Sequence, residues 1–311
     1  METLAIRNND AFQWTFNHLQ MFKANVLVLD TRTAQEFSSA HLPNSINVHP
    51  IEELSINYLE SCCTNTSETQ RFSRRRRLFI LIGAVPDSIS FARQLEALLR
   101  RDKCKEVSVL ANFNDFLIHY PYICQGNSCV SHPVSILGYP NEMIQNFLYL
   151  GDQRLAESKE VIHNLGITHI INATKRVPNK FEKDGVKYLR VYVEDDAEVK
   201  IKFHFSRAFQ FIDDALFENS QAARNKVLVH CAQGVSRSAT IVIMYLMKHF
   251  DWSYDLAFAF VKRHREIIDP NGGFMNQLQE FDEDKLLFPR STTMIKIKKL
   301  NPSTSAAKLR I

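Results

Sequence analysis

The segment from Lys226 to His249 constrains the fold of this chain more than any other part of the sequence. It opens with a short apolar run, Lys226–Val229, whose β-branched residues are typical of a buried strand. A loop of eleven residues follows, HCAQGVSRSAT from His230 to Thr240, and Ile241–His249 then has the length and composition of a helix. The sequence therefore predicts an α/β fold in which this loop leads from a strand into a helix N-terminus.

The backbone of this loop is suited to binding one phosphate group. A helix N-terminus presents unpaired N–H groups and a partial positive charge, so it attracts anions. Gly234 lets the chain curl so that successive N–H groups point inward. The residues expected to wrap the phosphate are Ala232, Gln233, Gly234, Val235, Ser236 and Arg237.

Cys231 and Arg237 stand six positions apart in the loop and supply its chemistry. A free thiol titrates near about 8.5, but a helix N-terminus or a neighbouring cation lowers its pKa and yields a thiolate nucleophile at neutral pH. The planar guanidinium of Arg237 can bind two phosphoryl oxygens at once. We expect Ser238 to help the sulfur leave, and His230 to orient the loop or to keep the thiolate charged.

The pattern HC-x-x-G-x-x-R-S/T resembles the signature loop of the cysteine-based protein phosphatases, and its SRSAT ending is similar to the dual-specificity branch. Three more stretches resemble that family in the expected order: Phe147–Gly151, Gly166–Thr174 and Ile268–Leu278. The resemblance implies a central sheet flanked by helices. It also implies hydrolysis of phosphotyrosine and of phosphoserine or phosphothreonine through a cysteinyl-phosphate intermediate, with no metal and no other cofactor.

Hydrolysis of a phosphate ester also needs a general acid, because an alkoxide or phenolate leaves poorly unless it is protonated. The candidates lie in Val191–Asp196. In dual-specificity phosphatases an aspartate follows the strand at this point, so the resemblance selects Asp195. Asp196 is the alternative, and both residues can also be plain loop carboxylates.

The N-terminal half alternates predicted strands with predicted helices, which indicates a small parallel α/β unit. The expected strands are Asn25–Asp30, Leu78–Ile82 and Glu106–Leu110, with helices at Thr31–Phe37 and Ile89–Arg100. The string VLDTRTAQEFSSAHLPNSINV resembles the opening motif of rhodanese domains. Active rhodaneses carry a cysteine in the loop after the central strand, whereas Ile80–Asp87 has none. We therefore expect a non-catalytic module, in which Asp30, Arg32, Glu36 and His41 form a buried ion pair and a turn.

These readings divide the chain into four parts: a rhodanese-like domain at 1–122, a linker at 123–141, a dual-specificity phosphatase domain at 142–288 and a basic tail at 289–311. This architecture resembles the MAP kinase phosphatases and a pseudophosphatase relative that lacks the nucleophilic cysteine. In the former, a basic cluster docks the kinase. The corresponding candidates here are Arg74, Arg75, Arg76 and Arg77, for which a solvated loop is the competing interpretation.

Composition excludes several other classes of protein. A net charge of +4 over 311 residues is too mild to indicate nucleic acid binding. No apolar run reaches the length of a membrane span, and the first residues do not resemble a signal peptide. The six cysteines show no C-x-x-C spacing, which is typical of a reducing compartment and gives no support to a zinc site. We therefore expect a cytoplasmic protein, with the nucleus left open.

Three functional hypotheses remain. The first is a protein phosphatase whose partner is a phosphorylated protein, with a MAP kinase as one candidate. The second is a phosphoprotein-binding adaptor with little or no turnover. The third is an RNA or phosphoinositide phosphatase, which is disfavoured because Ala232, Gln233 and Val235 stand where phosphoinositide phosphatases often use lysines.

Overall fold

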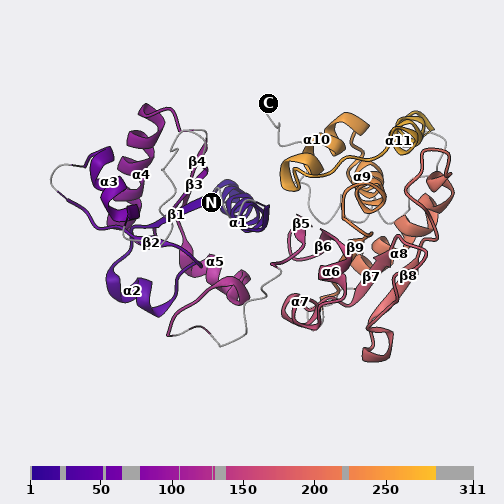
Figure 1. The fold of residues 1–311 in the computed structure, drawn as a ribbon, viewed down its shortest axis with the longest axis horizontal. Coiled ribbons are helices and arrows are strands. Elements are labelled where there is room, and N and C mark those ends of the chain that lie inside the picture. Colours follow the sequence, from indigo (N-terminus) through magenta and orange to yellow (C-terminus); the bar gives the residue numbers. More distant parts are fainter. Residues whose placement is uncertain are drawn as a thin grey trace.

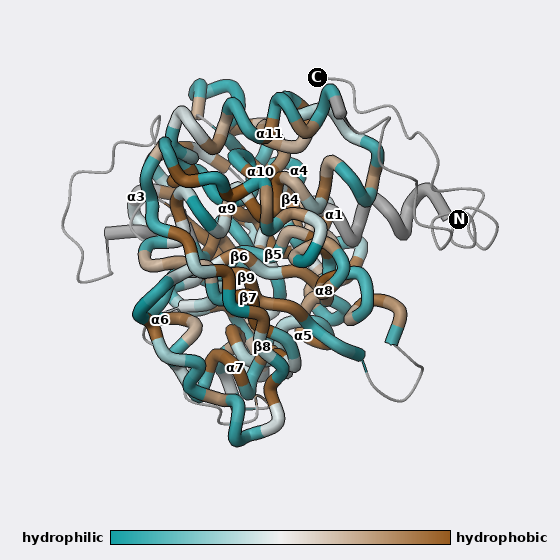
Figure 2. The backbone as a smooth tube through the Cα atoms, turned by 90° about the vertical axis from the view of Figure 1, so that its right-hand side faces the viewer, coloured by the Kyte–Doolittle hydropathy of each residue, from teal (hydrophilic) through white to brown (hydrophobic). Residues whose placement is uncertain are grey.

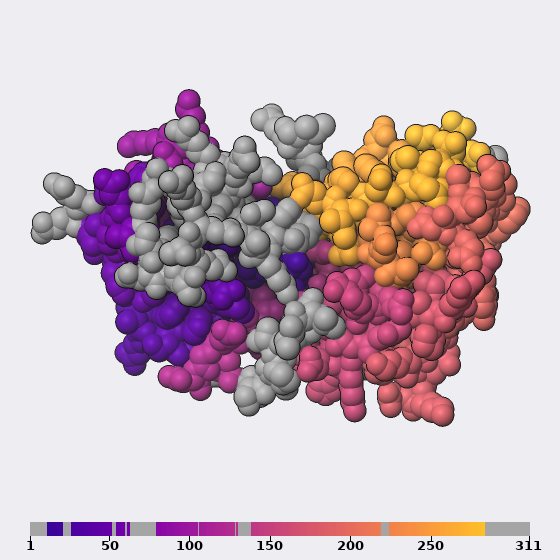
Figure 3. All heavy atoms as spheres, viewed as in Figure 1, coloured from indigo at the N-terminus to yellow at the C-terminus, as the bar shows by residue number. Residues whose placement is uncertain are grey.

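The computed structural model describes residues 2–21, 26–51, 54–64, 78–104, 106–127, 129, 138–218 and 224–284. These residues form two sheets with helices packed against them, in two lobes that Figures 1 and 3 show side by side. The two-domain α/β fold predicted from the sequence is confirmed. In the described part of the chain, no helix is both long enough and apolar enough to cross a membrane.

The N-terminal sheet has four parallel strands in the order β2-β1-β3-β4. Its elements are α1 (Glu2–Met21), β1 (Val26–Asp30), α2 (Ala34–Ser39), β2 (Ile46–Asn47), α3 (Ile56–Thr64), β3 (Leu78–Ile82), α4 (Pro86–Arg101), β4 (Glu106–Leu110), α5 (Phe113–His119) and the 3-10 turn η2 (Pro121–Ile123). Alternate strand residues face opposite ways. Leu29 and Leu81 pack with α3 and α4, while Val28 and Ile80 pack with α1 and α5.

Two predicted helices of this domain begin elsewhere than expected. Helix α2 begins at Ala34, because Thr33 is its N-cap and forms a capping box with Glu36. Helix α4 begins at Pro86, and proline is well suited to the first position of a helix because its missing N–H is not needed there. Both differences follow from side chains that start a helix, which a count of apolar positions does not detect.

The C-terminal sheet has five strands in the order β5-β6-β9-β7-β8, and only β5 is antiparallel to its neighbour. Its strands are β5 (Asn141–Ile144), β6 (Leu148–Gly151), β7 (His169–Asn172), β8 (Lys187–Arg190) and β9 (Val227–His230). Its helices are α6 (Gln153–Ala156), α7 (Lys159–Leu165), α8 (Phe205–Phe217), α9 (Arg237–Phe250), α10 (Tyr254–His264) and α11 (Gly272–Asp284), with 3-10 turns η3 (Glu182–Asp184) and η4 (Ile201–His204). In Figure 2 the apolar strands β6, β9 and β7 lie at the centre of this lobe.

Helix α9 lies at the centre of the second domain. It packs against β6, β9 and the helices α8, α10 and α11, and every side chain from Arg237 to Met247 is buried. A helix that is apolar on all sides is expected to be surrounded in this way. The helix begins at Arg237, four residues before the predicted start at Ile241, so the last residues of the phosphate-loop sequence form its first turn.

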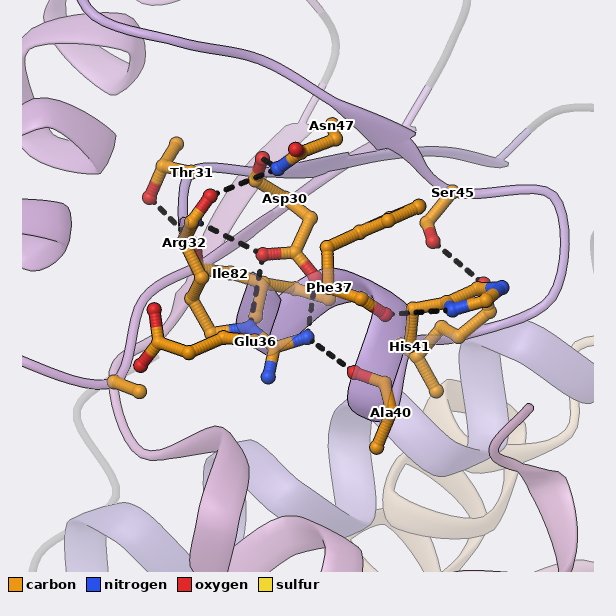
Figure 4. Close-up of polar contacts among 12 residues, drawn as sticks. Asp30, Thr31, Arg32, Glu36, Phe37, Ala40, His41, Ser45, Asn47 and Ile82 are labelled. Atoms are coloured by element: carbon orange, nitrogen blue, oxygen red, sulfur yellow. Dashed lines mark hydrogen bonds and ion pairs between the residues drawn. The ribbon is translucent and has the colours of Figure 1, made fainter. Parts of the chain in front are cut away.

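An ion pair between Asp30 and Arg32 is fully buried in the N-terminal domain (Figure 4). Arg32 Nη2 lies 2.6 Å from Asp30 Oδ2 and also donates to the carbonyl of Ala40, and its guanidinium stacks over the ring of Phe113. His41 Nδ1 lies 2.9 Å from the carbonyl oxygen of Phe37. The expected buried ion pair and turn are confirmed.

We predict that Arg32→Ala destabilises the N-terminal domain by about 3–5 kcal/mol, because it leaves the carboxylate of Asp30 buried without its countercharge. Urea unfolding of the full chain, followed through the transition of this domain, measures the loss. The control is Arg93→Ala, which removes an exposed ion pair with Glu96 and should cost below about 1 kcal/mol. Equal losses in the two variants would contradict the prediction.

Candidate active site

Cys231 follows the last residue of β9 and lies at the carboxyl end of the central strand. Only 1% of its surface is exposed, and its Sγ accepts hydrogen bonds at 3.2 Å from Gly234 N and from Ser238 Oγ. Burial alone would raise the pKa of this thiol. The hydroxyl and N–H of Ser238, the charge of Arg237 and the N–H of Val235 outweigh burial, so the pKa lies below its ordinary value. The site therefore favours a thiolate.

The loop around the sulfur requires glycine at position 234. Gly234 has φ +69°, and a Cβ atom there would lie 2.6 Å from the carbonyl oxygen of Gly151. An L-residue would thus be strained twice, by its backbone conformation and by contact with the end of β6. Glycine lets the loop fold back on the sulfur while resting against the sheet.

Arg237 is 9% exposed, and its guanidinium lies beside the loop. Its Nη1 is 3.4 Å from the carbonyl oxygen of Val193, and its Nε lies 3.5 Å from Asp195 Oδ2. Among the described residues, that buried Nε has no hydrogen-bond partner of normal geometry. Buried donors are nearly always paired, so this nitrogen is available to an oxygen of a bound phosphate.

The structure brings Asp195, and not Asp196, against the loop. Asp195 Oδ1 accepts from Ser236 Oγ at 2.6 Å and from Asn271 Nδ2 at 2.9 Å. Asp196 Oδ1 instead accepts from the backbone N–H of Glu198, and so stabilises its own turn. Of the two carboxylates, that of Asp195 thus contacts the loop and lies beside the guanidinium of Arg237, where a general acid is needed.

His230 is held in its neutral form. It is 1% exposed, and burial lowers its pKa to about 4. Its Nδ1 lies 3.4 Å from the carbonyl oxygen of Cys231. At neutral pH it therefore brings no positive charge to the thiolate, and of the two roles considered from the sequence the geometry favours orientation of the loop.

Three residues that sequence reasoning did not single out also shape the site. Asn271 is the residue before α11, where its Oδ1 accepts from Phe274 N while its Nδ2 holds Asp195. Gly273 faces the acid-bearing loop, since a Cβ there would overlap the backbone of Ala197. Arg265 donates to the carbonyls of Gly234 and Gln233. Asn271 has a local signal as a helix N-cap, but the contacts of the other two are long-range.

Several predicted features lie elsewhere. The candidate docking residues Arg74, Arg75, Arg76 and Arg77 and the tail at 289–311 fall outside the described residues. Gln233 and Ala232 are exposed on the loop, as residues that meet a substrate would be. Within the described ranges, no group of three His, Cys, Asp or Glu side chains could hold a metal ion.

We predict that Ser238→Ala raises the pKa of the Cys231 thiol, because it removes the hydroxyl that donates to Sγ. The midpoint of the iodoacetamide alkylation rate against pH should therefore move to higher pH, with Cys231→Ser identifying the alkylated residue. Thr240→Val is the matched control, because it removes a buried hydroxyl of the same helix that donates to Ser236 O instead. An unchanged midpoint in Ser238→Ala would refute this role.

Two family models match this chain, one in each half. The model of the dual specificity phosphatase catalytic domain matches residues 148–284, and that of the rhodanese-like domain matches residues 17–112. A solved structure, that of the human tyrosine phosphatase-like serine/threonine/tyrosine-interacting protein, is 34% identical with a TM-score of 0.43, covering 48% of this chain and 98% of its own.

Three curated relatives are similar to this chain over different lengths. A probable rhodanese domain-containing dual specificity protein phosphatase of Dictyostelium discoideum is 36% identical over 190 residues, which are 60% of this chain and 39% of the relative. Human dual specificity protein phosphatase 16 is 31% identical over 278 residues, which are 83% of this chain and 41% of the relative. Mouse dual specificity protein phosphatase 1 is 41% identical over 161 residues, which are 52% of this chain and 42% of the relative. The chain thus spans about two fifths of these relatives' length. The chain therefore carries a dual specificity phosphatase catalytic domain behind a rhodanese-like domain.

Proposed function

We propose that this chain is a cysteine-dependent protein phosphatase that hydrolyses phosphotyrosine and phosphoserine or phosphothreonine. The observation that supports it best is the convergence of three groups on one small site. Cys231 Sγ is surrounded by donors, Arg237 Nε has no hydrogen-bond partner of normal geometry among the described residues, and Asp195 lies 3.5 Å from that nitrogen. A nucleophile, an anion clamp and an acid are the parts that phosphoryl transfer requires.

In the first step, the thiolate of Cys231 attacks phosphorus while Arg237 and the loop N–H groups hold the phosphoryl oxygens. The bond from phosphorus to the ester oxygen breaks, and Asp195 gives that oxygen a proton. The products are a free hydroxyl on the substrate protein and a cysteinyl phosphate.

In the second step, water attacks the cysteinyl phosphate, and Asp195 takes the proton that water loses. The bond from phosphorus to sulfur breaks, inorganic phosphate forms and the thiolate is restored. The Ser238 hydroxyl, which donates to Sγ at 3.2 Å, stabilises the charge that returns to sulfur. Ser238 thus assists the second step, in which the sulfur is the leaving group.

A phosphoprotein-binding adaptor is the second candidate function, and one observation favours it. Asp195 accepts hydrogen bonds from Ser236 and Asn271 and also lies near Arg237, so all its contacts suit the charged carboxylate. If substrate binding did not release Asp195 from these contacts, the pocket would hold phosphate without protonating the leaving group. Measured turnover separates the two functions.

We also propose a doubly phosphorylated MAP kinase as a candidate substrate. The support is the order of the two domains and the run of four arginines from Arg74 to Arg77. A binding measurement with an inactive, phosphorylated MAP kinase tests it. Replacing the four arginines by alanine should weaken binding of the kinase and leave hydrolysis of a small aryl phosphate unchanged, whereas equal binding would exclude this docking mode.

We predict that Cys231→Ser abolishes hydrolysis of an aryl phosphate and of a Thr/Tyr doubly phosphorylated peptide. Asp195→Asn should lower kcat by about 10²–10⁴-fold, because it removes the proton donor. Asp196→Asn is the control and should stay within about three-fold of the wild type, since its carboxylate stabilises only its own turn. A wild-type protein that binds the phosphopeptide but does not hydrolyse it would instead support the adaptor function.

We predict that Gly273→Ala lowers kcat by about ten-fold or more, because its Cβ would push Ala197 and the acid-bearing loop away from the sulfur. Gly272→Ala is the matched control: it is the neighbouring residue of the same helix, and nothing lies within 4 Å of its added Cβ. Alkylation of Cys231 should be the same in both variants. Equal kcat values for the two would show that this contact does not position the acid.

A further inference from the structure

Helix α1 of the N-terminal half is bonded to the edge strand of the phosphatase sheet. Asn17 Nδ2 donates to the carbonyl of Glu142 at 2.8 Å, and Asn17 Oδ1 accepts from the N–H of Glu142 at 2.7 Å. The amide thus pairs with β5 as a neighbouring strand would. Both Asn17 and Glu142 are 0% exposed, so these bonds face no competition from water.

The same helix is fixed to the rhodanese-like domain. It contacts β4, and the ring of Phe16 stacks on that of Tyr120 with centroids 4.6 Å apart. The hydroxyl of Tyr120 in turn donates to the carboxylate of Glu142 at 2.6 Å. One continuous apolar cluster includes residues of both domains, and Figure 1 shows α1 lying between the two sheets.

A second contact leads from α1 toward the active site. Asn141 Nδ2 donates to the main-chain carbonyl of Asn17 at 3.3 Å, and Asn141 Oδ1 accepts from Arg265 Nη1 at 2.7 Å. The first bond fixes which way the Asn141 amide faces, because only its NH₂ group can donate to a carbonyl. The oxygen is thereby directed at Arg265.

Arg265 carries the contact into the phosphate loop. It is 7% exposed, its Nε donates to the carbonyl of Gly234 at 2.8 Å and its Nη2 donates to that of Gln233 at 3.3 Å. A peptide unit is planar and trans, so its C=O and N–H point in opposite directions. Holding these two carbonyls therefore turns the N–H groups of Gly234 and Val235 toward the sulfur, and Gly234 N does donate to Cys231 Sγ.

We propose that helix α1 sets the conformation of the phosphate loop through the chain of contacts Asn17, Asn141, Arg265 and Gly234. Asn17, Asn141 and Arg265 are positioning residues, because none of them touches the sulfur or a reacting group. The site of phosphate binding is thereby coupled to the N-terminal half of the protein. Only the turnover measurement rests on the proposed function. Anion binding and thiol reactivity report on the conformation of the loop directly.

The test compares full-length Asn17→Ala and Asn141→Ala with the wild type. Asn17→Ala removes the two side-chain bonds to Glu142 that hold the main-chain carbonyl of Asn17 against Asn141, and Asn141→Ala removes the contact itself. The affinity for tungstate, measured by calorimetry, should fall by about five-fold or more in both, as for residues coupled through one network. Alkylation of Cys231 at neutral pH should slow, and kcat for an aryl phosphate should fall. Gln13→Ala is the matched control, because it removes another side-chain bond from α1 to Glu142 O but lies one turn away from the carbonyl that Asn141 contacts. It should stay within about two-fold.

A double-mutant cycle separates positioning from general loss of stability. In an Arg265→Ala background, Asn17→Ala should cause no further loss of tungstate affinity, because the contact that transmits its effect is already absent. Additive losses would overturn the proposal, as would normal tungstate affinity in folded Asn17→Ala and Asn141→Ala.

A milder variant keeps the test decisive if Asn17→Ala does not fold. Asn17→Asp keeps the acceptor for Glu142 N but sets a carboxylate oxygen against the carbonyl of Glu142, so it should weaken tungstate binding as well. Wild-type affinity in this variant would overturn the proposal. A protein that binds tungstate normally and only fails to turn over would contradict the proposed function and not this coupling.

Discussion

A sulfur buried at the end of a central strand, whose surroundings lower its pKa and stabilise its thiolate, is the constraint on which the second domain depends. Cys231 is 1% exposed, and burying a charge without partners is strongly unfavourable. The partners come from one short segment: the start of α9 supplies Ser238 and Arg237, and the curl at Gly234 returns a backbone N–H to the sulfur. Because β9 is paired on both sides and α9 is enclosed by other helices, this segment has no freedom to relax away from the charge.

The groups that complete the site lie on elements that meet the loop from outside. Asn271 and Gly273, at the start of α11, hold the acid-bearing loop, one by a hydrogen bond to Asp195 and the other by leaving room for Ala197. Ser236 links the two parts, since its hydroxyl donates to Asp195 and lies 3.3 Å from the N–H of Asn271. The acid and the nucleophile are therefore positioned by separate elements and joined by short polar contacts, so each can be altered without the other.

The N-terminal domain uses the same parallel α/β design for a different purpose. Its buried Arg32 is neutralised by Asp30, and both are enclosed by backbone and by the ring of Phe113, so the pair serves the fold. Each of the two sheets also has edge strands, and unpaired edge strands favour association with other chains. Helix α1 contacts both β4 and β5, the edge strands that the two sheets turn toward each other.

Local patterns predicted three strands of the first sheet, the central strand β9 of the second and the phosphate loop, because β-branched runs such as Val227–Val229 and the glycine at 234 act within a few residues. Helix α1 could not be predicted that way. Of its residues, Phe12, Gln13, Thr15, Phe16, Asn17 and His18 are all buried, although four of the six are polar. Over residues 11–20 of this helix no side chain is exposed, so there is no solvent face to give an apolar period, and Gln13 and Asn17 are explained only by their bonds to β5 of the second domain. For the same reason Arg265, whose partners lie 31 and 124 positions away, has no local signal, and its role follows from the fold alone.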